Sequence, residues 1–341
     1  MQVTLGVVMD PIETITPRKD TTLAMLLAGQ RRGWALRVID QKDLWMRDGK
    51  VHARYRTIEV RDDDDDWFSV LDEGDAPLAE CHIVLMRKDP PFDMHYIYST
   101  YLLEHAAAAG VLVSNRPASL RDVNEKLFTA WFPEHCPTTL VSASSARLRE
   151  FIIEHDDVII KPLDGMGGTG IFRLTPDDPN LNIILEQSTM GDSLQIMAQR
   201  FLPEISEGDK RILVVDGKVV PFALARIPAA GETRGNLAAG GRGVPVALSD
   251  ANRRVAEALA PELVRRGLLF VGLDMIGNKL TEINVTSPTC VRELDAHMQA
   301  LPQNEGGSRN GSRDGSRDGS RNSIADDYLG ALESRLESRC D

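Results

Sequence analysis

The sequence contains no hydrophobic run that is long enough to cross a membrane. A membrane helix needs about 18 consecutive apolar residues. The apolar stretches here, such as Ile83 to Met86 and Leu268 to Leu273, are only long enough for strands. The N-terminal residues carry no basic leader and resemble a first strand rather than an export signal. We therefore expect a soluble, cytoplasmic protein with no membrane partner.

Cysteine and histidine are scarce, and neither occurs in a metal-binding spacing. The four cysteines, Cys81, Cys136, Cys290 and Cys340, lie far apart and form no C-x-x-C pair. The seven histidines form no H-x-x-x-H spacing. These absences argue against a disulfide framework and against a zinc enzyme, and they fit a reducing compartment.

Basic residues are outnumbered, with 39 Lys and Arg against 51 Asp and Glu, which gives a net charge of −12. An acidic chain repels polyphosphate backbones, so we expect no nucleic-acid partner. A small anion can still bind, because one pocket can be basic in an acidic protein. Hydrophobic and charged residues make up 42% and 26% of the chain, as in globular proteins, and 341 residues are enough for two or three domains.

Strand and helix signals alternate over the first part of the chain. The apolar run Val3 to Met9, a helix capped by Asp20, and a strand at Val111 to Val113 fit this alternation. The pattern predicts a parallel sheet with crossover helices, and thus an α/β domain. After Pro117 the pattern changes to strands joined by glycine-rich connections, which indicates a second domain.

Residues 303–322 contain four copies of Gly-Ser-Arg and no apolar residue. Such a composition cannot bury a core, so we expect a disordered, solvated insertion, with a peptide-binding or anion-binding arm as the alternative. Beyond it, Ile324, Leu329, Leu332 and Leu336 have helical spacing, which predicts a final helix that docks on the protein.

The segment from Val158 to Arg173 has the pattern of a strand, a lysine, a glycine-rich loop and a second strand. It is not a Walker A loop, because no Gly-Lys-Ser or Gly-Lys-Thr closes it. Its glycines let backbone N–H groups approach phosphate oxygens, and Lys161 adds a positive charge beside them. We therefore favour a loop that covers phosphates over a plain hairpin.

A second segment places oxygen-bearing side chains on neighbouring strands. Glu282 and Asn284 are two residues apart on a predicted strand, so both point to one face. If the preceding loop is Gly277 to Lys279, Asp274 lies directly across from Glu282 on that face. Two carboxylates repel each other unless a cation lies between them, and such donors favour Mg²⁺ bridged to nucleotide phosphates. A solvated hairpin face is the alternative.

A third segment, Arg226 to Gly243, contains three arginines and five glycines. A glycine-rich loop of this length is usually a lid or disordered, and the arginines favour a lid over anionic chemistry. Arg211 lies upstream of it, directly before a predicted strand. Positive charge therefore clusters in the sequence around the expected phosphate site.

Several motifs together resemble the bacterial glutathione synthetases, a family of ATP-grasp ligases. In chain order they are Met86 to Asp93, Ser119 to Leu127, Lys161 to Gly168, Arg234 to Gly243 and Thr281 to Thr289. The Lys-Pro glycine loop and Glu-x-Asn occur in many ATP-grasp enzymes. The Arg-Gly-Asn-Leu-Ala-Ala-Gly-Gly and Asn-Val-Thr-Ser-Pro-Thr runs are more specific to this family. The likeness covers the chain except the Gly-Ser-Arg repeat.

The resemblance implies an ATP-grasp fold, α/β with an α+β C-terminal half. An N-terminal doubly wound parallel-sheet domain would span residues 1–122. Two subdomains at 123–200 and 201–341 would clamp ATP, with a mobile lid at 227–242. The resemblance also implies a homo-oligomer, either a dimer or a tetramer.

The implied activity is the ATP-dependent joining of γ-glutamylcysteine and glycine to glutathione through an acyl phosphate. Mg²⁺ would be the metal, with Mn²⁺ as a substitute. One alternative is another ATP-grasp carboxylate–amine ligase, such as a D-alanine–D-alanine or glutamate ligase. A nucleotide-binding module that has lost catalysis is a second alternative, from a different class.

The resemblance also assigns a role to each candidate residue by position. The ATP phosphates would be contacted by Lys126, Lys161, Gly165, Met166, Gly167 and Gly168, and the rest of the nucleotide by Gln199, Phe201, Leu202 and Asp209. The metal would be bound by Asp274, Glu282 and Asn284. The catalytic arginines would be Arg211, Arg226, Arg234 and Arg242. The peptide and amino-acid substrates would be bound by Arg87, Asn284, Ser287, Thr289 and Arg292.

Overall fold

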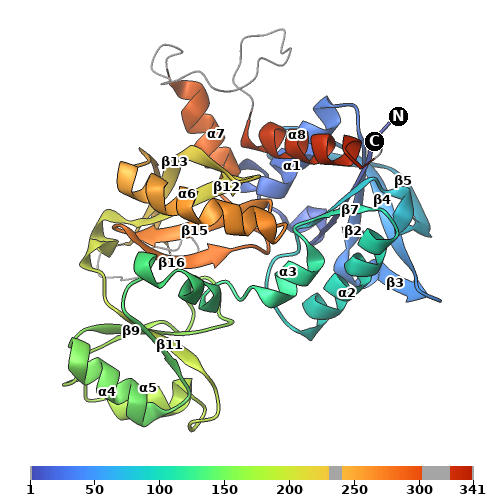
Figure 1. The fold of residues 1–341 in the computed structure, drawn as a ribbon. Coiled ribbons are helices and arrows are strands. Elements are labelled where there is room, and N and C mark those ends of the chain that lie inside the picture. Colours follow the sequence, from blue (N-terminus) through green and yellow to red (C-terminus); the bar gives the residue numbers. More distant parts are fainter. Residues whose placement is uncertain (1, 230–239, 302–322, 340–341) are drawn as a thin grey trace. The chain divides into compact units, whose positions relative to one another are not determined.

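The computed structural model describes residues 2–229, 240–301 and 323–339, which form two compact units (Figure 1). Unit 1 consists of Met1–Arg87, Ala106–Leu112 and Thr289–Asp341. Unit 2 consists of Lys88–His105 and Val113–Pro288. Within the described ranges, no helix is long and apolar enough to span a bilayer.

The sheet of unit 1 is built around β1 (Thr4–Met9). This strand pairs in parallel with β2 (Ala35–Asp40) on one side and with β6 (Ile83–Met86) on the other. All residues of β1 except the first are buried. A central parallel strand is covered on both faces, which is why it has the unbroken apolar sequence from which it was predicted.

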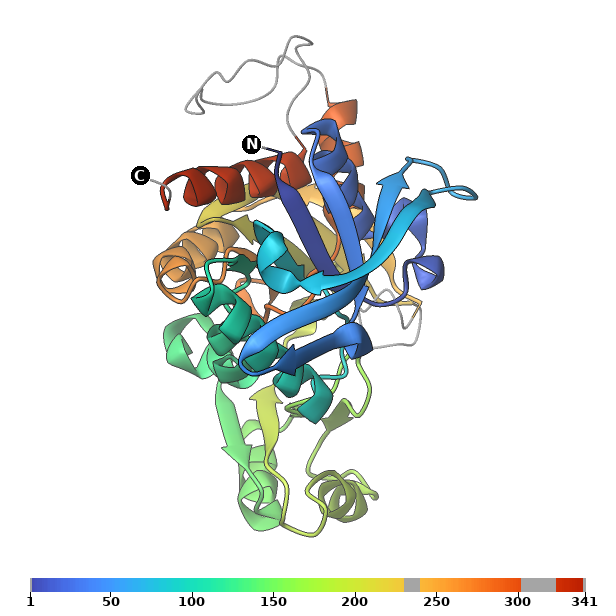
Figure 2. The ribbon, with the colours of Figure 1, turned by 90° about the vertical axis from the view of Figure 1, so that its right-hand side faces the viewer.

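The other part of this sheet is antiparallel, so the prediction of a parallel sheet is wrong there. The strand order is β3-β4-β2-β1-β6-β7, with β5 paired to β4, and the blue strands of Figure 2 twist across the sheet. β4 (Lys50–Val60) runs antiparallel to β2, to β3 (Leu44–Arg47) and to β5 (Phe68–Pro77). Asp48 and Gly49 both have positive φ, which makes a tight hairpin turn that only an antiparallel pair can use.

The helices of unit 1 include both the predicted first and last helices. α1 (Thr21–Arg31) begins at Asp20, whose carboxylate accepts a hydrogen bond from the Leu23 N–H. α8 (Ile324–Glu337) packs against α1, with Ile324, Leu329 and Leu332 buried. α7 (Val291–Ala300) also contacts both helices. The Gly-Ser-Arg tract lies outside the described residues.

The first sheet of unit 2 has four strands in the order β10-β9-β11-β8. One face packs on two helices, seen below β9 and β11 in Figure 1, around Val158, Ile160, Ile196 and Ala198. Side chains alternate across a strand, so the other face of β9 and β11 carries Ile159, Lys161 and Gln199. The elements are β8 (Thr139–Ser142), α4 (Ser145–His155), β9 (Val158–Pro162), β10 (Phe172–Leu174), α5 (Leu181–Ser188) and β11 (Ile196–Arg200).

The second sheet of unit 2 is fully antiparallel, in the order β14-β13-β12-β15-β16. Helix α6 (Asp250–Arg265) contacts β12 and β13. The strands are β12 (Asp209–Val215), β13 (Lys218–Ile227), β14 (Arg242–Ala247), β15 (Phe270–Ile276) and β16 (Lys279–Asn284). The expected lid corresponds to the connection from β13 to β14, of which residues 230–239 lie outside the described part of the chain.

The remaining elements connect these sheets. They are α2 (Met94–Ala108), α3 (Pro117–Asp122) and short 3₁₀ turns, including the one at Leu127–Trp131. β7 (Leu112–Ser114) is the last strand of the first sheet. The two sheets of unit 2 lie within residues 123–200 and 201–341, the segments expected for the clamping subdomains. The helices α7 and α8, however, belong to unit 1.

Candidate active site

A pocket in unit 2 is lined by both of its sheets. Its empty space measures about 890 Å³, including the part that is open to solvent. Predicted nucleotide residues that line it are Lys126, Lys161, Gly165, Met166, Gly167, Gly168, Gln199, Phe201, Leu202 and Asp209. Every candidate nucleotide residue therefore faces one cavity, together with Glu282 of the expected metal site.

One wall of the pocket is the open face of β9 and β11. Gln199 is buried there and donates from Nε2 to the Thr139 hydroxyl oxygen at 3.0 Å. That hydroxyl in turn donates to the Pro137 carbonyl at 2.7 Å, so it acts only as an acceptor toward Gln199. This leaves the side-chain carbonyl of Gln199 as a hydrogen-bond acceptor in a mainly apolar wall.

The glycine loop between β9 and β10 forms the cover of the pocket. Gly167 and Gly168 have φ angles of 64° and 83°, in the left-handed region that favours glycine. The Lys126 ammonium donates to the carbonyl oxygen of Gly165, which ties the loop to the segment before the 3₁₀ turn. The glycines thus give this loop a backbone shape that other residues adopt only with strain.

The acidic residues lie on adjacent strands in the predicted register, since Asp274 pairs with Glu282. The predicted three-residue loop is wrong, however. β15 and β16 are joined by Gly277 and Asn278 alone, because Ile276 already pairs with Lys279. A β-bulge with Thr281 as the extra residue restores the Asp274 to Glu282 pairing.

Two arginines share the face of Asp274. Arg211 pairs in register with Asp274, and Asp209 with Arg226, so the four side chains lie on one side of the sheet. Arg211 Nη2 is 3.0 Å and Arg226 Nη2 is 2.8 Å from Asp274 Oδ2. Burial opposes ionisation of Asp274, but both guanidinium groups together hold the pKa of its carboxyl well below the usual range. Burial raises the pKa of Asp209 to about 6, against the influence of Arg226.

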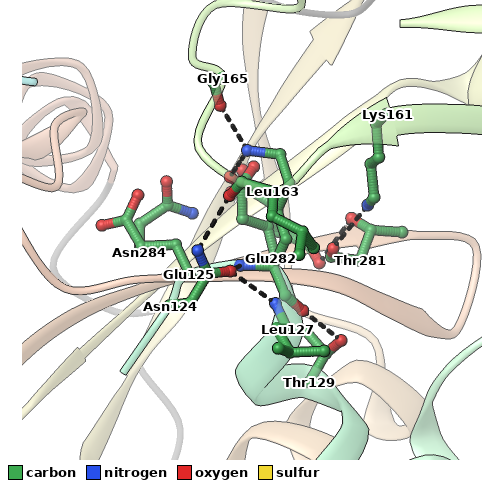
Figure 3. A network of polar contacts seen from close by, with 12 residues as sticks. Asn124, Glu125, Leu127, Thr129, Lys161, Leu163, Gly165, Thr281, Glu282 and Asn284 are labelled. Atoms are coloured by element: carbon green, nitrogen blue, oxygen red, sulfur yellow. Dashed lines mark hydrogen bonds and ion pairs between the residues drawn. The ribbon is translucent and has the colours of Figure 1, made fainter. Parts of the chain in front are cut away.

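Two buried lysines contact β16. Figure 3 shows Lys161 reaching Thr281. Lys126 Nζ lies 3.0 Å from Glu282 Oε1, and Lys161 Nζ donates to the carbonyl oxygen of Thr281 at 3.0 Å. Burial lowers the pKa of Lys161 to about 8, although the nearby Glu282 opposes this shift. The cations expected at phosphates therefore lie beside the acids expected at the metal.

The face of the sheet that carries Asp274, Glu282 and Asn284 offers the oxygen atoms that a hard divalent cation prefers. Asp274 and Glu282 supply carboxylates, and Asn284 donates its Nδ2 to the Gly272 carbonyl at 3.2 Å, which leaves its amide oxygen as a donor atom for a metal. Among the described residues, no three His, Cys, Asp or Glu side chains form a metal cluster. Mg²⁺ needs no such cage, because it is usually bound by one or two carboxylates, waters and phosphates.

The candidate substrate residues are divided between the units. Ser287, in unit 2, is buried and donates to Asp89 Oδ1. In unit 1, Arg87 is buried and contacts Thr22 Oγ1 at 3.2 Å, Arg292 pairs with Asp62, and Thr289 is exposed. Arg242 is exposed at the start of β14, and Arg234 lies outside the described residues.

Two residues with functional contacts were missed by the sequence analysis. Glu125 accepts three hydrogen bonds from residues just after β16, and Thr139 fixes the amide of Gln199. Burial, and repulsion from Glu282, raise the pKa of Glu125. Glu125 stands inside one of the quoted motifs, but a sequence does not show which way its side chain points.

Solved structures of low sequence identity share the fold. The structure of "D-cycloserine synthetase DcsG" has a TM-score of 0.62 and 15% identity, covering 98% of this chain and 99% of that one. D-alanyl-alanine synthetase A from Vibrio cholerae has a TM-score of 0.60 and 10% identity, covering 99% of both. "ATP-grasp ligase PsnB", solved with Mg and ADP, has a TM-score of 0.59 and 16% identity over 98% of both. The predicted ATP-grasp fold is confirmed.

Sequence comparisons identify the family. Residues 3–121 match the model "Prokaryotic glutathione synthetase, N-terminal domain", and residues 125–299 match "Prokaryotic glutathione synthetase, ATP-grasp domain". A glutathione synthetase of Yersinia pestis is 60% identical over 292 residues, covering 86% of this chain and 92% of that protein. One from Pseudomonas aeruginosa is 59% identical over 295 residues, covering 86% and 93%. The chain therefore belongs to the prokaryotic glutathione synthetase family of ATP-grasp ligases.

Proposed function

We propose that this chain joins γ-glutamylcysteine and glycine to form glutathione, with cleavage of ATP to ADP and phosphate. The observation that carries this proposal is the meeting of Lys126, Lys161, the glycine loop and the acidic strand β16 in one pocket. Such a site supplies charge compensation and positioning, which are what phosphoryl transfer requires. Relatives about 60% identical to the chain are glutathione synthetases.

The nucleotide would lie along the pocket wall. Gln199, Phe201 and Leu202 would contact the adenine, because all three line the pocket and none of them carries a charge. Lys126, Lys161 and the loop Gly165, Met166, Gly167 and Gly168 would hold the phosphates. Asp209 would face the remaining part of the nucleotide.

Asp274, Glu282 and Asn284 would hold Mg²⁺, or Mn²⁺ in its place. The ion, when bound, neutralises charge on the nucleotide phosphates. Arg211 and Arg226 keep Asp274 ionised and add positive charge on the same face. Arg242, at the start of β14, and Arg234 would be the further catalytic arginines.

The bond changes follow from an acyl-phosphate route. A cysteinyl carboxylate oxygen attacks the γ-phosphorus, and the bond from phosphorus to the ADP oxygen breaks. The glycine ammonium gives one proton to solvent, and the resulting amine attacks the acyl carbon. Phosphate then leaves and takes the second proton from the nitrogen as the amide forms. Arg87, Ser287, Thr289 and Arg292, with Asn284, would bind the two acids. An acyl phosphate hydrolyses in water, so the site must exclude solvent during the reaction.

We further propose that the enzyme works in the cytoplasm as a homo-oligomer, a dimer or a tetramer. Cys81 and Cys136 are buried and form no disulfide, which supports a reducing compartment.

Purified protein should release ADP only when both γ-glutamylcysteine and glycine are present. A coupled ADP assay, with glutathione measured in parallel, checks this and should give one glutathione per ADP. Replacing both γ-glutamylcysteine and glycine with D-alanine is the control that would detect a D-alanine–D-alanine ligase. ADP release that does not depend on glycine contradicts the proposal.

Glu282→Gln should reduce kcat by about two to three orders of magnitude, because a neutral amide loses the charge that pairs with Lys126 and the metal. Circular dichroism and the thermal midpoint should stay close to those of the parent. Glu257→Gln, on the exposed face of α6, is the matched control and should keep full activity. Parental kcat in Glu282→Gln would reject the metal assignment.

ADP affinity, measured calorimetrically in EDTA, should weaken by up to about tenfold per pH unit above pH 8. Lys161 has a pKa of about 8 in the free protein, and a bound phosphate raises that pKa, so binding takes up a proton there. In Lys161→Arg the charge persists and the affinity should be nearly constant from pH 7.5 to 9.5. Identical pH profiles for both proteins contradict this account.

A further inference from the structure

We propose that Glu125 is a positioning residue, which fixes the expected metal-binding strand β16 to the segment that carries Lys126. This inference rests on the proposed function, because it concerns the same metal and nucleotide site. Glu125 itself is not among the residues that line the pocket. It would act through the end of β16, which it binds, and through Lys126, its neighbour in the chain.

The contacts of Glu125 lie along the outer edge of β16. This strand is at the end of its sheet, so its outward N–H groups have no neighbouring strand to bind. The Ile283 N–H donates to the main-chain carbonyl of Glu125 at 2.8 Å. The Val285 N–H donates to Glu125 Oε1 at 2.7 Å, and Thr286 donates to it from N and Oγ1, both at 3.0 Å. One residue thus accepts hydrogen bonds from Ile283 of β16 and from the two residues that follow the strand.

These contacts are made by the residues directly before and directly after Asn284. Ile283 and Val285 are fully buried, so their side chains point into the core, and Asn284 between them points to the opposite face with Glu282. The carbonyl of Val285 is held as well, by Asn115 Nδ2 at 2.8 Å. The backbone after Asn284 therefore has little freedom to rotate, and the direction of the Asn284 amide follows from it.

The neighbours of Glu125 are bound to the phosphate side of the pocket. Asn124 donates from Nδ2 to the Leu163 carbonyl at 3.0 Å, just before the glycine loop, and its Oδ1 accepts from the Lys126 N–H at 3.1 Å. Lys126 contacts Gly165 and Glu282. Three consecutive residues thus join the phosphate loop, the phosphate lysine and the metal strand.

The carboxylate matters because one of its oxygens accepts three hydrogen bonds. Removing it leaves the N–H groups of Val285 and Thr286 without this acceptor at buried positions. A glutamine keeps an acceptor oxygen at the same place, whereas an alanine does not. Partners that orient metal ligands are typically worth about ten- to a hundredfold in metal affinity.

The test compares ADP binding with Mg²⁺ and in EDTA for parent, Glu125→Ala and Glu125→Gln, by calorimetry on the full chain. In Glu125→Ala the strengthening of ADP binding by Mg²⁺ should fall by about tenfold or more, with the affinity in EDTA changed by less. Glu125→Gln should keep most of the strengthening. A merely structural role would lower the thermal midpoint without changing this ratio. Glu134→Ala, at an exposed glutamate of the same region, is the matched control.

If Mg²⁺ strengthens ADP binding in Glu125→Ala by the same factor as in the parent, the inference is overturned and the proposed function stays intact. If Glu125→Ala does not fold, Glu125→Asp replaces it, because its carboxylate is one methylene too short to reach the same N–H groups. A parental ratio in that variant overturns the inference equally. If the parent shows no strengthening by Mg²⁺, the metal assignment fails, and the inference fails with it.

Discussion

Two carboxylates at paired positions on a sheet face can both stay ionised only when cations oppose them, since a buried, unpaired carboxylate is costly. In unit 2, Asp274 is only 2% exposed and is bound by Arg211 and Arg226, and Glu282 is bound by Lys126. Each carboxylate is thus offset by cations of the protein itself. A nucleotide with its metal brings both signs of charge, so it can join this arrangement without leaving either sign uncompensated.

This charge balance explains why segments far apart in the sequence meet at β16. Lys126 comes from the turn after α3, Lys161 from the four-stranded sheet, and both reach the bulged part of β16 around Thr281 and Glu282. The bulge turns one extra residue out of the ladder and keeps Asp274 opposite Glu282. The bulge thus keeps the two acidic side chains opposite each other. The contacts of Glu125 then hold the end of the bulged strand in place.

The sequence predicted those features that depend on short-range periodicity. Alternation on β16 placed Glu282 and Asn284 on one face, and the glycine spacing indicated the loop after Lys161. It did not predict the antiparallel half of the first sheet, where the tight turn at Asp48 and Gly49 reverses the chain between β3 and β4. Nor could it predict the bulge at Thr281 or the salt bridges of Asp274, which depend on register between β12, β13 and β15. The confirmed family came from motifs rather than from periodicity.

The most direct test of the central claim is a crystal structure of the protein with ADP and Mn²⁺, with the metal located by its anomalous scattering. The account predicts a strong peak in contact with oxygens of Asp274, Glu282 and Asn284 and with the ADP phosphates, with Lys126 and Lys161 beside those phosphates. A metal bound to ADP but away from all three side chains would contradict it.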